Sequence, residues 1–156
     1  MKLLYVCTHN RCRSILSEAI TNHLAGPRLQ ARSAGSQPAG VVHPLSLFYL
    51  EEAGIPTQGL KSQSWDEFTD YAPDLVITVC DNAANETCPA WLGKSQKIHW
   101  GLADPSKVEG TDDEIASAFR QTIAEISRRT QLLLALCTQN VDITTLKAGM
   151  QKMGAG

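Results

Sequence analysis

The segment at residues 6–14, Val-Cys-Thr-His-Asn-Arg-Cys-Arg-Ser, constrains the fold of this chain more than any other. An apolar run at 3–6 precedes it and is typical of a buried strand, and an amphipathic run at 15–24 follows it and is typical of a helix. A loop between a strand and the start of a helix can turn backbone N–H groups inward, where the helix dipole adds partial positive charge. We therefore predict that residues 7–14 bind an oxyanion, and we call them the oxyanion loop.

Four side chains give the oxyanion loop its chemical character. Arg13 carries a planar guanidinium that matches a tetrahedral oxyanion, and Cys7 lies at the mouth of the positive pocket, where its thiolate should be stabilised. Ser14 could hydrogen-bond the Cys7 sulfur, and Asn10 suits a left-handed turn. The competing interpretation is that Cys7 is an inert core residue, as a cysteine between apolar segments often is.

Strand-like and helix-like segments alternate along the chain. The predicted strands cover 2–7, 29–33, 74–79 and 97–100, and the predicted helices cover 13–24, 43–53, 64–68 and a long segment after residue 111. The apolar stripe of the long helix consists of Ile115, Phe119, Ile123, Ile126 and Leu133. This alternation predicts an α/β fold, a three-layer sandwich in which a four-stranded parallel sheet has helices on both faces.

Three reactive side chains follow the predicted strands. Cys7 follows the first strand, Cys80 the third and Asp104 the fourth. Because ligands in such folds bind outside the carboxyl ends of the strands, we expect these three side chains to converge on one edge of the sheet.

Composition and charge exclude several functions. The net charge of −2 gives no footprint for nucleic acid, and the longest apolar run, at 132–137, is too short to span a membrane. The chain starts without an apolar leader and contains five cysteines, an odd number, so we expect a cytoplasmic protein with reduced thiols. The cysteine spacings lack the usual Cys-x2-Cys zinc knuckle, and we predict no metal site.

A pair of cysteines, Cys80 and Cys88, flanks a short polar segment. A straight helix would separate them by about 12 Å, whereas a disulfide needs α-carbons within about 7 Å, so a bond between them requires the segment to rearrange. The functional interpretation is a thiol relay from Cys7 through Cys80 to Cys88; the alternative is that the two thiols are unrelated.

We expect one domain over residues 1–138 and an extension over 139–156. Four apolar residues in the extension recur at helical spacing after Asp142: Ile143, Leu146, Met150 and Met153. We predict a short helix that packs on its own domain or on a second copy, with a docking surface for a partner as the alternative.

Together these features make the chain resemble the arsenate reductases built on the low-molecular-weight protein tyrosine phosphatase fold, of the thioredoxin-coupled type. The resemblance is carried by Cys-Thr-x-Asn-x-Cys-Arg-Ser at 7–14, by Glu18, Ser-Ala-Gly at 33–35, Cys80 and Cys88, and by His-Trp-Gly-Leu-Ala-Asp-Pro at 99–105. It covers roughly the first 130 residues.

The resemblance implies a site and a reaction. The residues implied to bind arsenate, or a phosphate-like oxyanion, are Thr8, His9, Asn10, Arg11, Cys12, Arg13 and Ser14. Cys7 would attack arsenic, Asp104 would protonate the departing oxygen, and Cys80 would then attack Cys7 and release arsenite. Cys88 would take over the disulfide, which thioredoxin, or glutathione with glutaredoxin, would reduce. No bound cofactor is implied.

One departure concerns a monovalent-cation site that some relatives carry near the loop. Asn10, Glu18 and Ser33 match it, but Gln63 stands where Asp is expected, which weakens the case for potassium. Three further side chains have no step of the reaction assigned to them. We expect Cys12 to pack beneath the loop, with a protective bridge to Cys7 as the alternative, Cys137 to be buried, and His9 to lie exposed on the rim.

Two other functions stay open. A phosphatase would hydrolyse phosphomonoesters through a Cys7 phosphocysteine, with Cys80 and Cys88 guarding against oxidation; Leu102 and Ala103 beside Asp104 offer no aromatic side chain to hold a phosphotyrosine ring. A non-enzymatic oxyanion or redox sensor would have no use for the acid Asp104.

Overall fold

The computed structural model describes residues 1–26, 28–80, 96–138, 145 and 148–149. The elements in chain order are β1 (Lys2–Val6), α1 (Arg13–Ala25), β2 (Gln30–Ala34), α2 (Pro44–Glu52), the 3-10 helix η1 (Trp65–Phe68), β3 (Leu75–Thr78), β4 (Gln96–His99), the 3-10 helix η3 (Pro105–Lys107) and α4 (Asp112–Thr138). The predicted segments therefore form, with ends that differ by one or two residues.

The four strands form one parallel sheet in the order β2-β1-β3-β4. The two central strands are buried along almost their whole length, since Leu3 to Val6 and all of β3 are closed to solvent. Near-continuous apolar runs are typical of parallel strands that are covered by helices. The predicted α/β fold with a four-stranded parallel sheet is confirmed.

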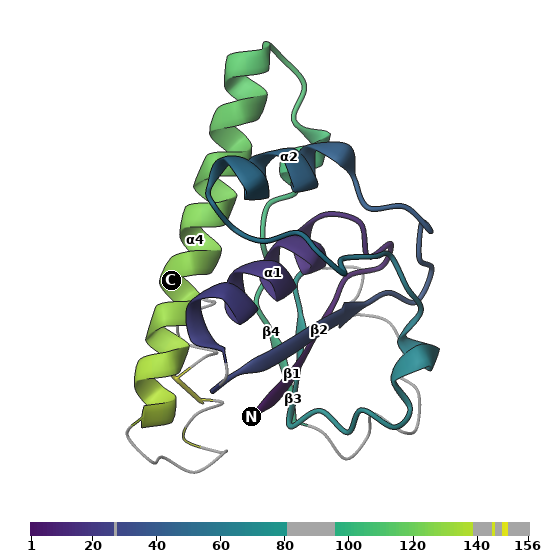
Figure 1. Ribbon diagram of the computed structural model, residues 1–156, viewed down its shortest axis with the longest axis vertical. Coiled ribbons are helices and arrows are strands. Elements are labelled where there is room, and N and C mark those ends of the chain that lie inside the picture. Colours follow the sequence, from purple (N-terminus) through teal and green to yellow (C-terminus); the bar gives the residue numbers. More distant parts are fainter. Residues whose placement is uncertain (27, 81–95, 139–144, 146–147, 150–156) are drawn as a thin grey trace.

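The helices pack over the sheet and over each other. Figure 1 shows α1 and α4 side by side, with α2 above α1 and against α4. The predicted stripe of α4 faces this core: Phe119, Ile123, Ile126 and Leu133 are buried, and Ile115 at the start of the helix is half-buried. Tyr49 of α2 stacks on Phe119 with the ring centroids 5.0 Å apart.

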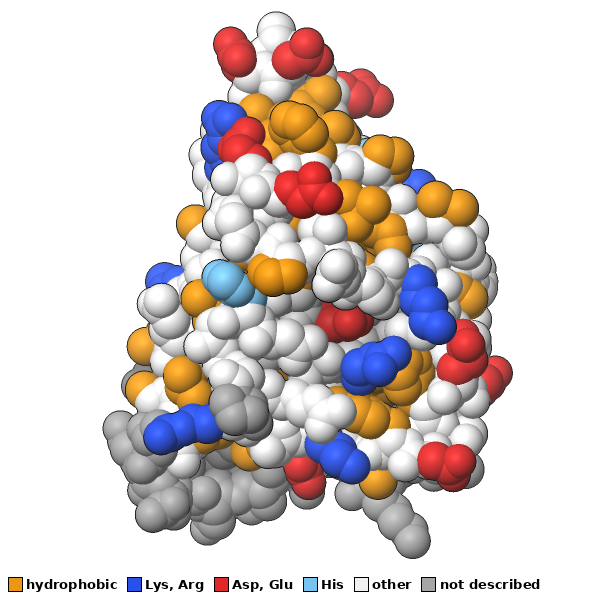
Figure 2. Space-filling model, viewed as in Figure 1, with side chains coloured by type: hydrophobic (Ala, Val, Ile, Leu, Met, Phe, Trp, Pro, Cys, Tyr) orange, Lys and Arg blue, Asp and Glu red, His pale blue; other side chains and the backbone are white. Residues whose placement is uncertain are grey.

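Some hydrophobic side chains remain at the surface around α2. Phe48 is 56% exposed. Figure 2 shows hydrophobic side chains (orange) over the upper part of the molecule, where α2 lies. No helix in the described part of the chain is long and apolar enough to cross a membrane. The predicted extension over 139–156 lies almost entirely outside the described residues.

The ends of three strands bring distant segments to one edge of the sheet. Val79 donates its N–H to the Val6 carbonyl, and Leu102 donates its N–H to the Val79 carbonyl, at 3.0 and 3.1 Å. These bonds tie the oxyanion loop, the end of β3 and the segment after β4 together. Backbone hydrogen bonds therefore bring Cys7, Cys80 and the Asp104 segment to one edge of the sheet, as expected.

Candidate active site

The oxyanion loop joins β1 to α1 and is held by a left-handed residue. Asn10 has φ +47° and is fully buried, as expected for a turn residue of its type. Its side chain donates to Ser14 Oγ and accepts from the backbone N–H of Gln63, both at 2.8 Å. The Ser14 hydroxyl therefore contacts Asn10, and the predicted bond to the Cys7 sulfur is not found among the described residues.

The carbonyl groups of the loop point away from its concave side. The carbonyls of Thr8, His9 and Arg11 accept backbone N–H bonds from Gln37, Ala39 and His43, at 2.9 to 3.0 Å. Because N–H and C=O groups point in opposite directions across a trans peptide, outward carbonyls turn amide groups of the loop inward. The dipole of α1 adds partial positive charge at this end of the helix. The first turn of α1 has no acidic residue that would offset this charge.

Gly35, which follows β2, lies directly against the loop. A Cβ atom at this position would be 2.5 Å from the Thr8 carbonyl oxygen and 2.6 Å from that of Cys7. Only glycine fits such a close approach between two backbones. The Ser-Ala-Gly motif thus has a physical role in shaping the loop.

Arg13 projects from the start of α1 toward the segment after β4. Its Nη1 donates to the Leu102 carbonyl at 3.1 Å, and its Nη2 lies 3.6 Å from Asp104 Oδ2. Its buried Nε has no hydrogen-bond partner among the described residues. The guanidinium is therefore fixed in orientation and still has a donor to offer to a bound anion.

Asp104 stands at the N-cap of η3, beside Arg13. One carboxylate oxygen, Oδ1, accepts from the Ser106 N–H at 3.0 Å and from Ser106 Oγ at 2.6 Å. The other oxygen, Oδ2, is the one that faces Arg13. This division orients the carboxyl group so that one oxygen is available for proton transfer at the site.

Cys80 lies beside Cys7. The Thr8 hydroxyl and the Cys80 sulfur are 3.7 Å apart, and the thiols of Cys80 and Cys7 are hydrogen-bonded. This hydrogen bond and burial raise the pKa of the Cys7 thiol, against the opposing effects of Arg13 and the His9 N–H. The sequence predicts a Cys7 thiolate stabilised near neutral pH; in this arrangement the Cys80 hydrogen bond and burial outweigh Arg13 and raise the pKa of Cys7.

The loop, Cys80 and the Asp104 segment enclose a cavity of about 270 Å³. Its lining residues are Cys7, Thr8, His9, Arg11, Cys12, Arg13, Ala39, Cys80, Asp104 and Lys107. Most of the predicted site residues therefore line this one cavity; Asn10 and Ser14 brace the loop from within. His9 is exposed, as predicted.

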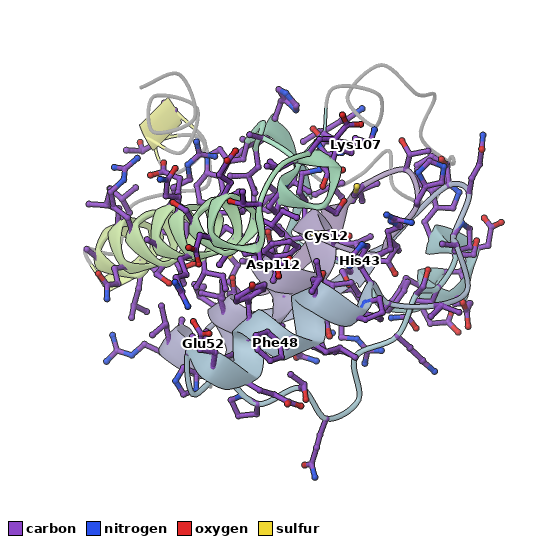
Figure 3. All side chains as sticks on the ribbon, turned by 90° about the horizontal axis from the view of Figure 1, so that it is seen from above. Cys12, His43, Phe48, Glu52, Lys107 and Asp112 are labelled. Carbon is purple, nitrogen blue, oxygen red and sulfur yellow. The ribbon has the colours of Figure 1, made fainter. Side chains whose placement is uncertain are left out.

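Lys107 is the residue at this cavity that sequence reasoning missed. It lies on η3 and is exposed. Figure 3, seen from above, shows Cys12 at the start of α1 with Lys107 on one side and His43, which precedes α2, on the other. The signal that could have found it is its position three residues after Asp104 on the same short helical turn.

The other cysteines differ in their surroundings. Cys12 is buried under the loop, as predicted, and burial raises the pKa of its thiol to about 11. Cys137 is only partly buried, contrary to the prediction of full burial, because it lies at the last turn of α4. Cys88 lies outside the described residues.

The four residues compared with a cation site do come together. Ser33 Oγ donates to Glu18 Oε1 at 2.5 Å, Gln63 Nε2 donates to the Ser33 carbonyl at 3.2 Å, and Asn10 binds the Gln63 N–H. Burial raises the pKa of Glu18. In the described part of the chain, no group of three or more His, Cys, Asp or Glu side chains is arranged to hold a metal ion.

Comparison with known sequences gives one family and a set of enzymes. The profile of the family described as low molecular weight phosphotyrosine protein phosphatase matches residues 2–147. The chain is similar to an arsenate reductase of Halalkalibacterium halodurans, with 35% identity over 127 residues that make up 81% of this chain and 90% of the relative. It is also similar to a glutaredoxin arsenate reductase of Synechocystis, at 28% identity over 86% of this chain and 96% of the relative.

A solved structure agrees with these similarities. A thioredoxin-dependent arsenate reductase of Corynebacterium glutamicum superposes with a TM-score of 0.60 and 31% identity over 84% of this chain. The present chain spans 62% of the length of that structure.

Proposed function

The chain belongs to the low molecular weight phosphotyrosine protein phosphatase family, and on that premise we propose that it reduces arsenate to arsenite. The observation that carries the proposal is the hydrogen-bonded pair of thiols, Cys7 and Cys80, at one oxyanion-binding cavity. Transfer of a phosphoryl group needs one nucleophile at the loop, whereas a two-electron reduction needs a second thiol within reach of the first.

The first step is attack by Cys7 on bound arsenate. The amide groups of the oxyanion loop and Arg13 hold the anion, and Cys7 reacts as a thiolate once its proton has left. A sulfur–arsenic bond forms and an arsenic–oxygen bond breaks. Asp104 donates the proton that lets the oxygen leave as water.

The second step is the redox step. The Cys80 sulfur attacks the Cys7 sulfur, so that a disulfide forms and the sulfur–arsenic bond breaks. The electron pair of that bond stays on arsenic, which leaves as arsenite, and the two thiols are oxidised together. The contact between Cys80 and Cys7 supports this step.

Regeneration completes the cycle. Cys88 attacks Cys80 and releases Cys7, and the resulting Cys80–Cys88 disulfide is reduced by an external dithiol protein. We propose thioredoxin as this reductant, because an internal relay ends in a protein disulfide and needs no glutathione adduct. The similarity to a thioredoxin-dependent enzyme supports this choice, and the similarity to a glutaredoxin enzyme makes glutaredoxin with glutathione the alternative.

The second candidate function is phosphomonoester hydrolysis. Cys7, Arg13 and Asp104 would suffice for it, and the family membership favours it. Among the described lining residues, however, the cavity offers no Phe, Tyr or Trp side chain to hold an aryl ester. A small inorganic oxyanion fits the polar walls better.

The test is NADPH consumption in a coupled assay. Arsenate is supplied to the protein with thioredoxin and thioredoxin reductase, or with glutathione, glutaredoxin and glutathione reductase. We expect turnover with the thioredoxin system, and loss of multiple turnover in Cys80→Ser. Hydrolysis of p-nitrophenyl phosphate that is unaffected by Cys80→Ser, together with no arsenate reduction by the unaltered protein, would establish the phosphatase instead.

A further inference from the structure

A buried arginine on α4 contacts the segment that carries Asp104. Arg129 is 6% exposed, and its Nη1 donates to the carbonyls of Trp100 and Gly101 at 3.2 and 3.4 Å. Its guanidinium carbon lies 5.8 Å from the centre of the Trp100 ring. Glu125 accepts from Arg129 Nε at 2.8 Å. A buried guanidinium is costly unless its donors are used, so these bonds fix its position.

The two carbonyls begin a segment that we call the acid loop, residues 100–104. One residue beyond Gly101, the Leu102 carbonyl accepts from Arg13 Nη1, and the Leu102 N–H donates to Val79. Asp104 follows at the end of the loop, 3.6 Å from Arg13 Nη2. Arg129 thus acts on the same short piece of backbone that sets the distance between the acid and the anion-binding guanidinium.

Side chains at two positions of the acid loop pack into clusters that include α4: Trp100 shares one with Leu133, and Leu102 packs against the one that contains Ile123. A cavity of about 390 Å³ lies between residues 101–105 and the side chains of Ala118, Thr122 and Glu125. This space separates the backbone of the loop near Asp104 from α4, so side-chain packing alone does not fill the gap there. The hydrogen bonds from Arg129 hold the backbone carbonyls of the loop's first two residues to α4.

We propose that Arg129 is a positioning residue for the acid loop, and that its contacts with the Trp100 and Gly101 carbonyls hold Asp104 where it can deliver a proton. The inference rests on the proposed function in that Asp104 acts as the general acid. Proton transfer requires heavy atoms about 2.6–3.2 Å apart, and a misplacement of about 1 Å can cost about 100-fold in rate. Without the Arg129 hydrogen bonds to its first two carbonyls, the acid loop would no longer keep Asp104 within the distance needed for proton transfer.

The experiment compares two neighbouring arginines that share one carboxylate. Arg128 binds Glu125 through Nε and Nη2, is exposed, and has no hydrogen bond or ion pair with the acid loop among the described residues. In the arsenate assay we expect Arg129→Met to lower kcat by about 10- to 100-fold. Arg129→Lys, which keeps the charge but contacts one carbonyl at most, should recover only part of the loss. Arg128→Met should retain the kcat of the unaltered protein.

A second background separates positioning from general damage to the fold. In Asp104→Asn, which has no acid to position, Arg129→Met should lower kcat by no more than about threefold. An equal loss in both backgrounds, or an equal loss in Arg128→Met, would overturn the proposal.

The two proposals fail in different ways. If the unaltered protein hydrolyses aryl phosphates but does not reduce arsenate, the proposed function is wrong. The role of Arg129 is then tested with two aryl phosphates whose leaving groups differ in their need for an acid. Arg129→Met should then slow phenyl phosphate far more than 2,4-dinitrophenyl phosphate, whose leaving group needs no acid. If neither substrate reacts, a crystal structure of Arg129→Met decides: an acid loop that keeps Asp104 in place beside Arg13 overturns the inference.

Discussion

Cys7 directly follows β1 and Cys80 lies just after β3, and the thiols of these two residues are hydrogen-bonded to each other. The hydrogen bond raises the pKa of the Cys7 thiol, and burial adds to this effect. The nucleophile is thus held in its thiol form by the residue that we propose as its later partner. Arg13 and the His9 N–H work in the opposite direction and lower this pKa.

Replacement of Cys80 by Ala should lower the pKa of Cys7, because it removes the largest of the effects that raise it. Alkylation of Cys7 by iodoacetamide at pH 7 should become faster, by about tenfold for each unit by which the pKa falls. The rate can be followed by mass spectrometry of the Cys7 peptide over a range of pH. The same variant should lose multiple turnover with arsenate.

The matched control for this experiment is Cys137→Ala, at the far end of α4. It removes a thiol of intermediate exposure that does not line the cavity. Its Cys7 should be alkylated at the rate of the unaltered protein. A Cys80→Ala protein in which Cys7 reacts no faster would mean that Cys80 does not raise the pKa of Cys7.

Replacement of Gly35 by Ala should both destabilise the protein and disturb the oxyanion loop. The added methyl group would meet the carbonyl oxygens of Thr8 and Cys7 at 2.5 and 2.6 Å, and both are backbone atoms that cannot turn aside. Overpacking of this kind costs about 1–3 kcal/mol. We expect urea unfolding to show this loss, and kcat/KM for arsenate to fall because the loop amides are displaced.

Gly59→Ala provides the comparison for Gly35. Gly59 has φ +81° with open space around the added carbon, so its cost of about 1 kcal/mol would come from backbone conformation alone. It should leave arsenate kinetics unchanged. Normal stability and normal kinetics in Gly35→Ala would show that the loop has more freedom than its packing implies.

Much of the site was predictable because it is encoded locally. The strand before Cys7, the helix after it and the left-handed Asn10 follow from neighbouring residues, and the structure has them as predicted. The convergence of Cys7 and Cys80 was predictable for another reason. In a parallel sheet every strand ends at the same edge, so a reactive residue after each strand reaches that edge whatever the details of packing.

The features that sequence reasoning missed depend on side chains from distant segments. The Ser14 hydroxyl accepts from the Asn10 side-chain amide, which the left-handed turn places beside it. The pKa of Cys7 depends on Cys80, and the support of the acid loop depends on Arg129, 25 residues after Asp104. Helical periodicity marks Arg129 only as a polar residue on an amphipathic helix, since a pattern of hydrophobicity does not reveal which carbonyls a buried guanidinium will meet.

Lys107 should attract the anionic substrate without taking part in the chemistry. It is exposed at the rim of the cavity that contains Cys7 and Arg13. Lys107→Ala should raise KM for arsenate by a few-fold with little change in kcat, and the effect should shrink as salt screens the charge. Initial rates at low and high ionic strength measure this. Lys61→Ala, an exposed lysine that does not line the cavity, should have no such effect; a salt-independent change in Lys107→Ala would point to direct contact instead of attraction.

Glu125 should contribute a pH-dependent part of the stability of the fold. The hydrogen bond from Arg128, and after it the one from Arg129, hold the pKa of Glu125 down to about 2, below its usual value of about 4.5. A carboxylate with a lowered pKa in the folded protein stabilises that state above its unfolded pKa, and this contribution is lost as pH falls from about 4.5 through about 2. Since the side chain is 33% exposed, solvent screening limits the effect to about 1 kcal/mol.

Urea unfolding of Glu125→Gln should therefore show a lower free energy of unfolding near pH 7, and this deficit should become smaller at pH values approaching 3. Glu52→Gln, which breaks an exposed pair with Arg120, is the matched control and should lose less at pH 7. A deficit in Glu125→Gln that stays constant from pH 7 to pH 3 would mean that the carboxylate acts through packing and not through its charge.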